Sequence, residues 1–165
     1  MMQRCSLQTG FSLLEVLIAI VVLTAGLLGL ASLQVKSQQF NSHSYYSTQA
    51  TVITHDMLER MRANIAGQQA GYYHLPVAQL VSSCYTTVGC NTQEMAQNDV
   101  YEWSGLGQTS IAEKLPQGKA VVCLDSTPND GSPQSAECDG TGRIYAIKIW
   151  WQDTEPRQMI TTAAF

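Results

Sequence analysis

The sequence predicts an α+β fold in which one long N-terminal helix packs on a small C-terminal antiparallel sheet. Three observations lead to it: an apolar run from Phe11 to Val35 that contains a single charge, an amphipathic repeat at residues 50–65, and strand-like segments after residue 119. The chain has 165 residues, of which 45% are hydrophobic and 13% charged. This composition suits one modest domain plus an apolar segment.

The apolar run is long enough to cross a membrane once. As a helix, residues 11–33 would extend roughly 34 Å, against roughly 30 Å of hydrocarbon. Arg4 lies before the run and Lys36 is the first charge after it. This arrangement favours a cytoplasmic N-terminus and an exported C-terminal part. The single acid, Glu15, would cost roughly 2.5–3.5 kcal/mol at the membrane centre and less near the interface, so its position calls for a positive partner.

The segment from Gly10 to Ala19 reads Gly-Phe-Ser-Leu-Leu-Glu-Val-Leu-Ile-Ala. It resembles the class III signal of the type IV pilin superfamily. The resemblance implies that a prepilin peptidase and methyltransferase of the inner membrane cuts after Gly10, removes the leader of residues 1–10 and methylates the new N-terminal Phe11. The helix of residues 11–33 is then retained, first as a membrane anchor and later in the filament core.

Electrostatics gives Glu15 a role in such a filament. Among packed apolar helices, its carboxylate and the freed amine of Phe11 on a neighbouring subunit would each be costly alone and much less costly together. A helix in the wrong register would leave both charges unpaired. We therefore expect the pair to set subunit register more than to add net stability.

Two other interpretations of the apolar run remain open. A secretory signal peptide could use Gly29-Leu30-Ala31 as its cleavage site, but the run exceeds the usual 7–15 residues and Glu15 interrupts it. A plain transmembrane anchor explains the length but not the acid or the short polar leader.

The helix is expected to continue outside the membrane over residues 34–66. Apolar residues recur there at three- and four-residue steps, which is typical of an amphipathic helix, and the pattern ends near Gly67. The repeating residues are Ala50, Ile53, Met57, Leu58, Met61 and Ile65. Residues 67–118 show no long periodic segment and are predicted to be a loop-rich connection.

Strands are predicted at 120–124, 143–152 and 159–165, within a C-terminal sheet region of residues 119–165. In the second strand, alternation places Tyr145, Ile147, Ile149 and Trp151 on one face. Trp150 and Trp151 would point to opposite faces, so one can serve the core while the other is a candidate surface anchor. Trp103, in the irregular region, is a further candidate of the same kind.

Four cysteines remain once Cys5 leaves with the leader: Cys84, Cys90, Cys123 and Cys138. An even number in an exported domain favours disulfides. Of the three possible pairings, local closure favours Cys84 with Cys90 and Cys123 with Cys138. The second bond would close a loop rich in Asp, Asn, Ser, Pro and Gly.

Metal sites are disfavoured. The cysteine spacing does not fit zinc. Asp125, Thr127 and Asn129 alternate as in a calcium loop, but Asp130 stands where glycine is expected and Ala136 where an acid is needed. No cofactor is implied.

No enzyme signature appears in the sequence. His43, His55 and His74 are widely spaced, and no nucleophile elbow, phosphate loop or dinucleotide fingerprint is present. The net charge of −4 and the lack of a Lys/Arg cluster argue against nucleic-acid binding.

Three further segments, His55–Asn64, Val122–Pro128 and Tyr145–Trp151, resemble the minor pilins of the superfamily. The resemblance implies a subunit that helps initiate a type IV pilus, together with other minor pilins, the major pilin and a tip adhesin. Two rivals are a minor pseudopilin that primes a type II secretion filament and a pilin for DNA uptake or adhesion.

Overall fold

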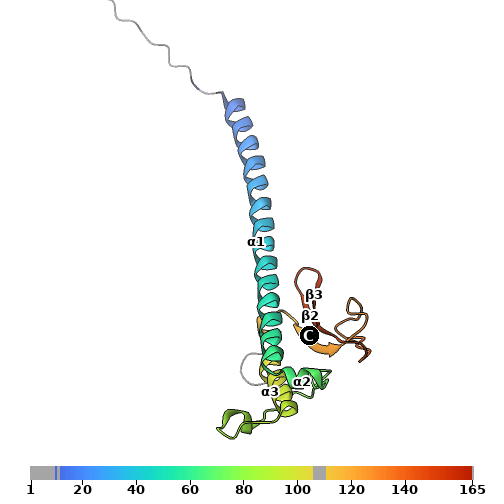
Figure 1. Ribbon diagram of the computed structural model, residues 1–165. Helices are drawn as coiled ribbons and strands as arrows, with labels where there is room; N and C mark the ends of the chain where they lie inside the picture. Colours follow the sequence, from blue (N-terminus) through green and yellow to red (C-terminus); the bar gives the residue numbers. More distant parts are fainter. Residues whose placement is uncertain (1–9, 11, 106–110, 165) are drawn as a thin grey trace, which may run out of the picture. The chain divides into compact units, whose positions relative to one another are not determined.

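The computed structural model describes residue 10, residues 12–105 and residues 111–164. The chain divides into two compact units, residues 1–42 and residues 43–165, and we call the second unit the head. Helix α1, Leu13–Ala63, begins in the first unit and ends in the head (Figure 1).

Helix α1 ends because Asn64 leaves the helical conformation. The next helix, α2 (Ile65–Gln69), starts behind Asn64, whose side chain accepts a hydrogen bond from the backbone N–H of Gly67 at 3.1 Å. A Cβ at Gly67 would lie 2.4 Å from the Asn64 amide nitrogen, so this close turn requires glycine. The amphipathic helix thus ends four residues before Gly67, and a separate short helix passes through that glycine.

Residues 67–118 differ from the loop-rich expectation. They contain a 3₁₀ turn, η1 (Ser82–Tyr85), the 13-residue helix α3 (Thr92–Ser104) and a short helix, α4 (Ile111–Lys114). Asn91 and Glu94 form a reciprocal capping box at the start of α3, and Gly105 ends it in the left-handed conformation. Helix α3 has no clear apolar repeat in the sequence, because few of the residues on its buried side are apolar.

The sheet has three antiparallel strands in the order β1-β2-β3. They are β1 (Lys119–Leu124), β2 (Ile144–Gln152) and β3 (Pro156–Ala164). The expected fold, a long helix packed on a small antiparallel sheet, is confirmed. Strand β3 begins three residues earlier than predicted, at Pro156, because a proline is tolerated as the first residue of an edge strand.

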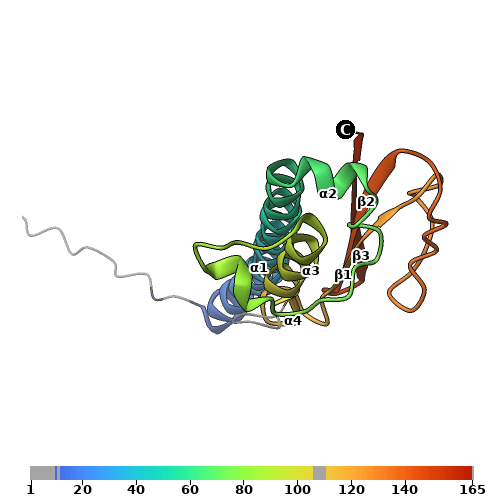
Figure 2. The ribbon, with the colours of Figure 1, turned by 60° about the horizontal axis from the view of Figure 1, so that its bottom comes forward.

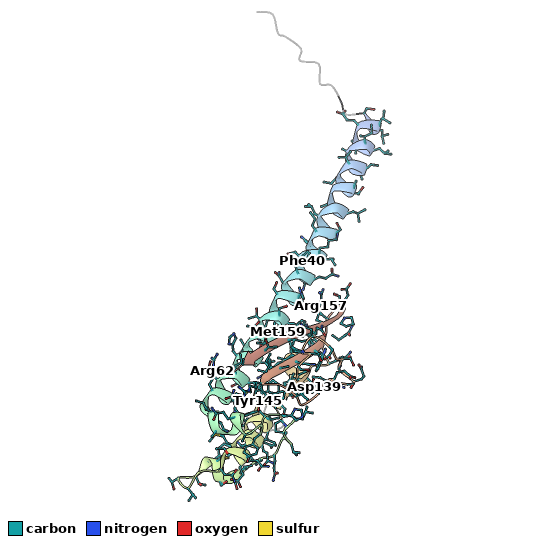
Figure 3. The ribbon with its side chains drawn as sticks, turned by 45° about the vertical axis from the view of Figure 1, so that its right-hand side comes forward. Phe40, Arg62, Asp139, Tyr145, Arg157 and Met159 are labelled. Atoms are coloured by element: carbon teal, nitrogen blue, oxygen red, sulfur yellow. A yellow bond between two sulfur atoms is a disulfide. The ribbon has the colours of Figure 1, made fainter. Side chains whose placement is uncertain are left out.

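The core of the head lies between the sheet and helices α1 and α3. Met57 and Met61 of α1, Trp103 of α3 and Ile147 of β2 belong to one buried cluster. Met159 of β3 also packs against this cluster (Figure 3). Figure 2 shows α1 and α3 on one side of the sheet and the orange chain between β1 and β2 on the other.

Strand β2 is buried on both faces, from Tyr145 to Trp151. The residues predicted to share one face, Tyr145, Ile147, Ile149 and Trp151, all belong to the core cluster. Ala146, Lys148 and Trp150 alternate with them and are buried as well. The segment that follows β1, residues 125–139, covers this outer face, and we call it the 125–139 loop.

Candidate functional site

The N-terminal site begins at the edge of the described chain. Gly10 is exposed, whereas Phe11, the residue expected to be cleaved free and methylated, lies outside the described residues, as do residues 1–9 of the expected leader. The backbone carbonyl of Ser12 accepts hydrogen bonds from the N–H groups of Glu15 at 3.0 Å and Val16 at 3.3 Å. Helix α1 therefore starts directly behind the expected cleavage point.

Glu15 lies in the first turn of α1 and is exposed. A negative charge at this end of a helix is favoured by the helix dipole. Among the described residues, the carboxylate of Glu15 has no side-chain hydrogen bond or ion pair. It is thus free to accept a partner from another molecule.

The first part of α1 is apolar on every side, and it packs against none of the other described residues of its own unit. Leu13 is 88% exposed, Leu28 is 73% exposed, and the side chains project around the helix (Figure 3). By length and composition, α1 is the one described helix able to cross a membrane. A helix that is apolar all round requires lipid or other apolar helices as its surroundings.

Two disulfides hold the loops of the head. Cys84 is bonded to Cys90, and Cys123 is bonded to Cys138. These are the pairs that local closure favours. Because all four sulfurs are in disulfides, the grouping of Cys123, Asp125 and Cys138 lacks the free thiolates that a zinc site would use.

The 125–139 loop encloses the ammonium group of Lys148. Its side chain is fully buried, and its ammonium lies 2.6 Å from the buried carboxylate of Asp125 and 2.9 Å from that of Asp130. It also donates to the backbone carbonyls of Asp130 at 3.1 Å and Ala136 at 2.8 Å. The cation that organises the 125–139 loop is therefore a side chain of β2.

Lys148 and its acidic neighbours each favour the ionised form of the other. Burial lowers the pKa of Lys148, but hydrogen bonds and charge attraction from Asp125 and Asp130 outweigh it and leave the pKa above its usual value. The same contact with Lys148, followed by a hydrogen bond from Thr127, holds the pKa of Asp130 below its usual value. Sequence reasoning missed this cluster, although a lone lysine inside an apolar strand was a signal for a buried ion pair.

A second polar cluster joins α1 to α3. The guanidinium of Arg60 lies 2.6 Å from the carboxylate of Glu102 and 3.6 Å from that of Asp99. The hydroxyl of Tyr73 donates to Asp99, and burial followed by this bond raises the pKa of Tyr73. Hydrogen bonds from Tyr85 and Arg60 lower the pKa of Glu102. These contacts dock α3 on α1.

The tryptophan anchors expected at the surface are inside the head. Trp103 lies in α3, is 4% exposed and donates its indole N–H to the backbone carbonyl of Ile53 at 2.8 Å. Trp150 is 5% exposed because the 125–139 loop covers its face of the sheet. Both predictions of a surface anchor were wrong, since elements distant in sequence cover these side chains.

The three histidines have different neighbours. His43 lies 3.7 Å from the carboxylate of Asp153, His74 accepts a hydrogen bond from the backbone N–H of Leu124 at 3.2 Å, and His55 is exposed. The described structure does not bring the histidines together into one site.

Comparison with known families gives two matches. Residues 32–101 match the Tt1218-like family, described as type IV pilin Tt1218, and residues 5–31 match the prokaryotic N-terminal methylation motif. No curated protein and no solved structure matches the chain. The chain is thus similar to a type IV pilin over residues 32–101, directly after a segment that matches an N-terminal methylation motif.

Proposed function

We propose that this protein is a minor pilin that helps initiate a type IV pilus, and that it corresponds to the type IV pilus modification protein PilV. The observation that carries the proposal is Glu15, an unpaired acid in the first turn of an exposed apolar helix, just behind the expected cleavage site at Gly10 and Phe11. The match to a type IV pilin over residues 32–101 supports a pilus component.

The proposed sequence of events follows the chemistry of the N-terminus. The protein is first anchored in the inner membrane by residues 11–33, with its N-terminus in the cytoplasm and its head in the periplasm. The prepilin peptidase and methyltransferase removes residues 1–10 and methylates Phe11. The new amine of one subunit then pairs with Glu15 of another as the apolar helices pack. The resulting complex includes other minor pilins, the major pilin and a tip adhesin, and the protein has a structural role without enzymatic activity.

The test is the Glu15→Ala variant, expressed in cells that lack the native gene. We expect normal cleavage and methylation at Phe11, normal membrane insertion, and a loss of at least about tenfold in incorporation into sheared pili, because the freed amine would lack its counter-charge. N-terminal sequencing and quantitative immunoblotting of membrane and pilus fractions measure these steps.

The matched control is Glu59→Ala, which removes an acid from the exposed surface of α1 in the head, where it pairs with Arg62. This variant should incorporate normally. Normal incorporation of Glu15→Ala would overturn the role given to the acid, and a native protein that works with residues 1–10 attached would overturn the proposal as a whole.

The two rival functions predict other phenotypes. A type II pseudopilin would share the signal, Glu15 and the apolar helix, but its deletion would abolish enzyme secretion and leave pili intact. A DNA-uptake pilin would give salt-dependent DNA binding by the protein. The match to a type IV pilin favours the pilus over the secretion filament.

A further inference from the structure

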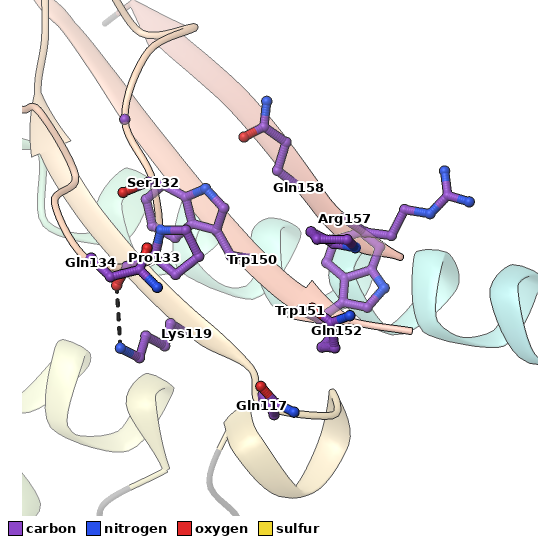
Figure 4. Close-up of a pocket in the computed structure, with 12 residues that line it drawn as sticks. Gln117, Lys119, Ser132, Pro133, Gln134, Trp150, Trp151, Gln152, Arg157 and Gln158 are labelled. Atoms are coloured by element: carbon purple, nitrogen blue, oxygen red, sulfur yellow. Dashed lines mark hydrogen bonds between the residues drawn. The ribbon is translucent and has the colours of Figure 1, made fainter. Parts of the chain in front are cut away.

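A cavity of about 590 Å³ opens beside the outer face of the sheet (Figure 4). Lys119, Trp150 and Gln158 are direct cross-strand partners on β1, β2 and β3, so their side chains share this face. Residues 131–134 of the 125–139 loop form another wall. The volume lies in the range of small-molecule sites.

The charge of the cavity is opposite to that of the chain. Lys119 and Arg157 line it, and no Asp or Glu is among its described lining residues, although the chain carries a net charge of −4. The guanidinium of Arg157 also lies 3.8 Å from the carboxylate of Glu155, which does not line the cavity, so Lys119 is the cation without an acidic partner there. The ammonium of Lys119 donates to the backbone carbonyl of Pro133 at 3.3 Å, which holds it beside the cavity. The cavity is therefore suited to a negatively charged ligand.

The remaining polar groups suit hydroxyls. Gln117, Gln134, Gln152 and Gln158 line the cavity, and each amide offers donors and an acceptor. The indole N–H of Trp150 is buried without a hydrogen-bond partner among the described residues. The protein encloses this N–H, so it serves as a reporter of the cavity wall and not as a ligand contact.

Apolar surface completes the lining. Pro133 and the indole of Trp150 lie next to each other in Figure 4. Pro156, which pairs with Gln152 where β2 turns into β3, also lines the cavity. A simple inorganic anion would not use this surface or the four amides. A sugar ring that bears a carboxylate would use the cations, the amides and the apolar surface at once.

We propose that the cavity beside Trp150 binds an acidic sugar residue of the uronic acid type, with its carboxylate toward Lys119 or Arg157 and its hydroxyls on the glutamine amides. This binding activity is separate from assembly. It is tested on purified protein, so its failure would leave the filament role of Glu15 untouched, and failure of that role would leave sugar binding intact.

The test compares galacturonate with galactose, which differ by a carboxylate against a neutral CH₂OH group. Full-length protein in a detergent without a sugar headgroup is titrated with each sugar and with acetate and inorganic phosphate, and the indole N–H signals are followed by NMR. We expect galacturonate to shift the Trp150 signal and to bind at least about tenfold more tightly than galactose. The Trp103 signal, whose N–H is already bonded to Ile53, should not move.

Matched variants locate the charge contact. Lys119→Gln and Arg157→Gln are expected to weaken galacturonate binding and to leave galactose binding nearly unchanged, with a loss of about tenfold for the residue that holds the carboxylate. Lys114→Gln, an exposed lysine of α4 that does not line the cavity, is the control.

Three results would overturn the proposal. One is that no binding is detected at galacturonate concentrations up to roughly 10 mM, since a site of lower affinity would hardly be occupied. Another is binding of acetate or phosphate as tight as that of galacturonate, which would mean a plain anion site. The third is a galacturonate affinity that neither Lys119→Gln nor Arg157→Gln alters.

Discussion

At the scale of the residue, Lys148 shows how one buried charge organises a surface loop. The side chain comes from β2, while its partners Asp125, Asp130 and Ala136 all belong to the loop that follows β1. The buried pair with Asp125 stabilises the head only while both partners are present, because either charge alone would be buried without compensation.

We predict that Lys148→Met lowers the free energy of unfolding of the head by about 3 kcal/mol, because it leaves the Asp125 carboxylate buried and unpaired. Denaturant titration of the purified full-length protein, monitored by tryptophan fluorescence, measures this. The double variant Lys148→Met, Asp125→Asn should regain more than half of the loss, since Asn keeps the acceptor used by the Thr127 N–H but carries no charge. A Lys148→Met protein as stable as the Lys114→Met control would contradict this account.

At the scale of the element, the disulfides and the capping box give order to segments with little apolar surface. The Cys123–Cys138 bond closes the 125–139 loop over the outer face of β2, and the Cys84–Cys90 bond holds the segment that leads into α3. Both segments are rich in small polar residues, which do not bury enough apolar area to fix a conformation.

The two disulfides should differ in how much they contribute to the free energy of unfolding. By the chain-entropy argument, replacing Cys123 and Cys138 by alanine should cost about 3 kcal/mol, against about 2 kcal/mol for Cys84 and Cys90, because the sequence separations are 15 and 6. The first change also loosens the backbone that holds Lys148 and the wall of the cavity. Thermal unfolding of the two double variants tests the order, and a larger loss for the Cys84 and Cys90 variant would contradict it.

At the scale of the whole molecule, the two units place different demands on their surroundings. Residues 1–42 expose an apolar helix that needs lipid or neighbouring helices, whereas the head has a core of its own. The head also carries carboxylates with lowered pKa values at three places, Glu102, Asp130 and Asp139. Its stability should therefore depend on pH.

The direction of this dependence follows from linkage. When folding lowers the pKa of a carboxylate, the stability that it contributes is present above the unfolded pKa of about 4 and is lost as the pH falls through the folded value. We expect the head to lose stability as the pH falls below about 4. Asp99 acts in the opposite direction, because burial raises its pKa.

Denaturant midpoints measured between about pH 7 and pH 3 test this expectation. Asp139→Asn should reduce the fall of the midpoint on acidification. The reason is that the side-chain hydrogen bond from Ser126 and the backbone hydrogen bond from Thr141 lower the pKa of Asp139. Glu137→Gln, which removes an exposed carboxylate of the same loop, serves as the control and should leave the change of stability with pH nearly unchanged. A midpoint that rises on acidification would contradict the prediction.

The sequence alone determined the features that depend on neighbouring residues: the apolar run in which Glu15 is the single charge, the amphipathic repeat, the strand alternation and the even set of cysteines. Periodicity and local chain closure carry that information. The tertiary structure decided the contacts of Lys148 with the 125–139 loop, the burial of Trp103 and Trp150 and the docking of α3 on α1. Each depends on contacts between residues far apart in the chain, which no local pattern encodes, because a buried charge or indole is stabilised only by the element that comes to lie over it.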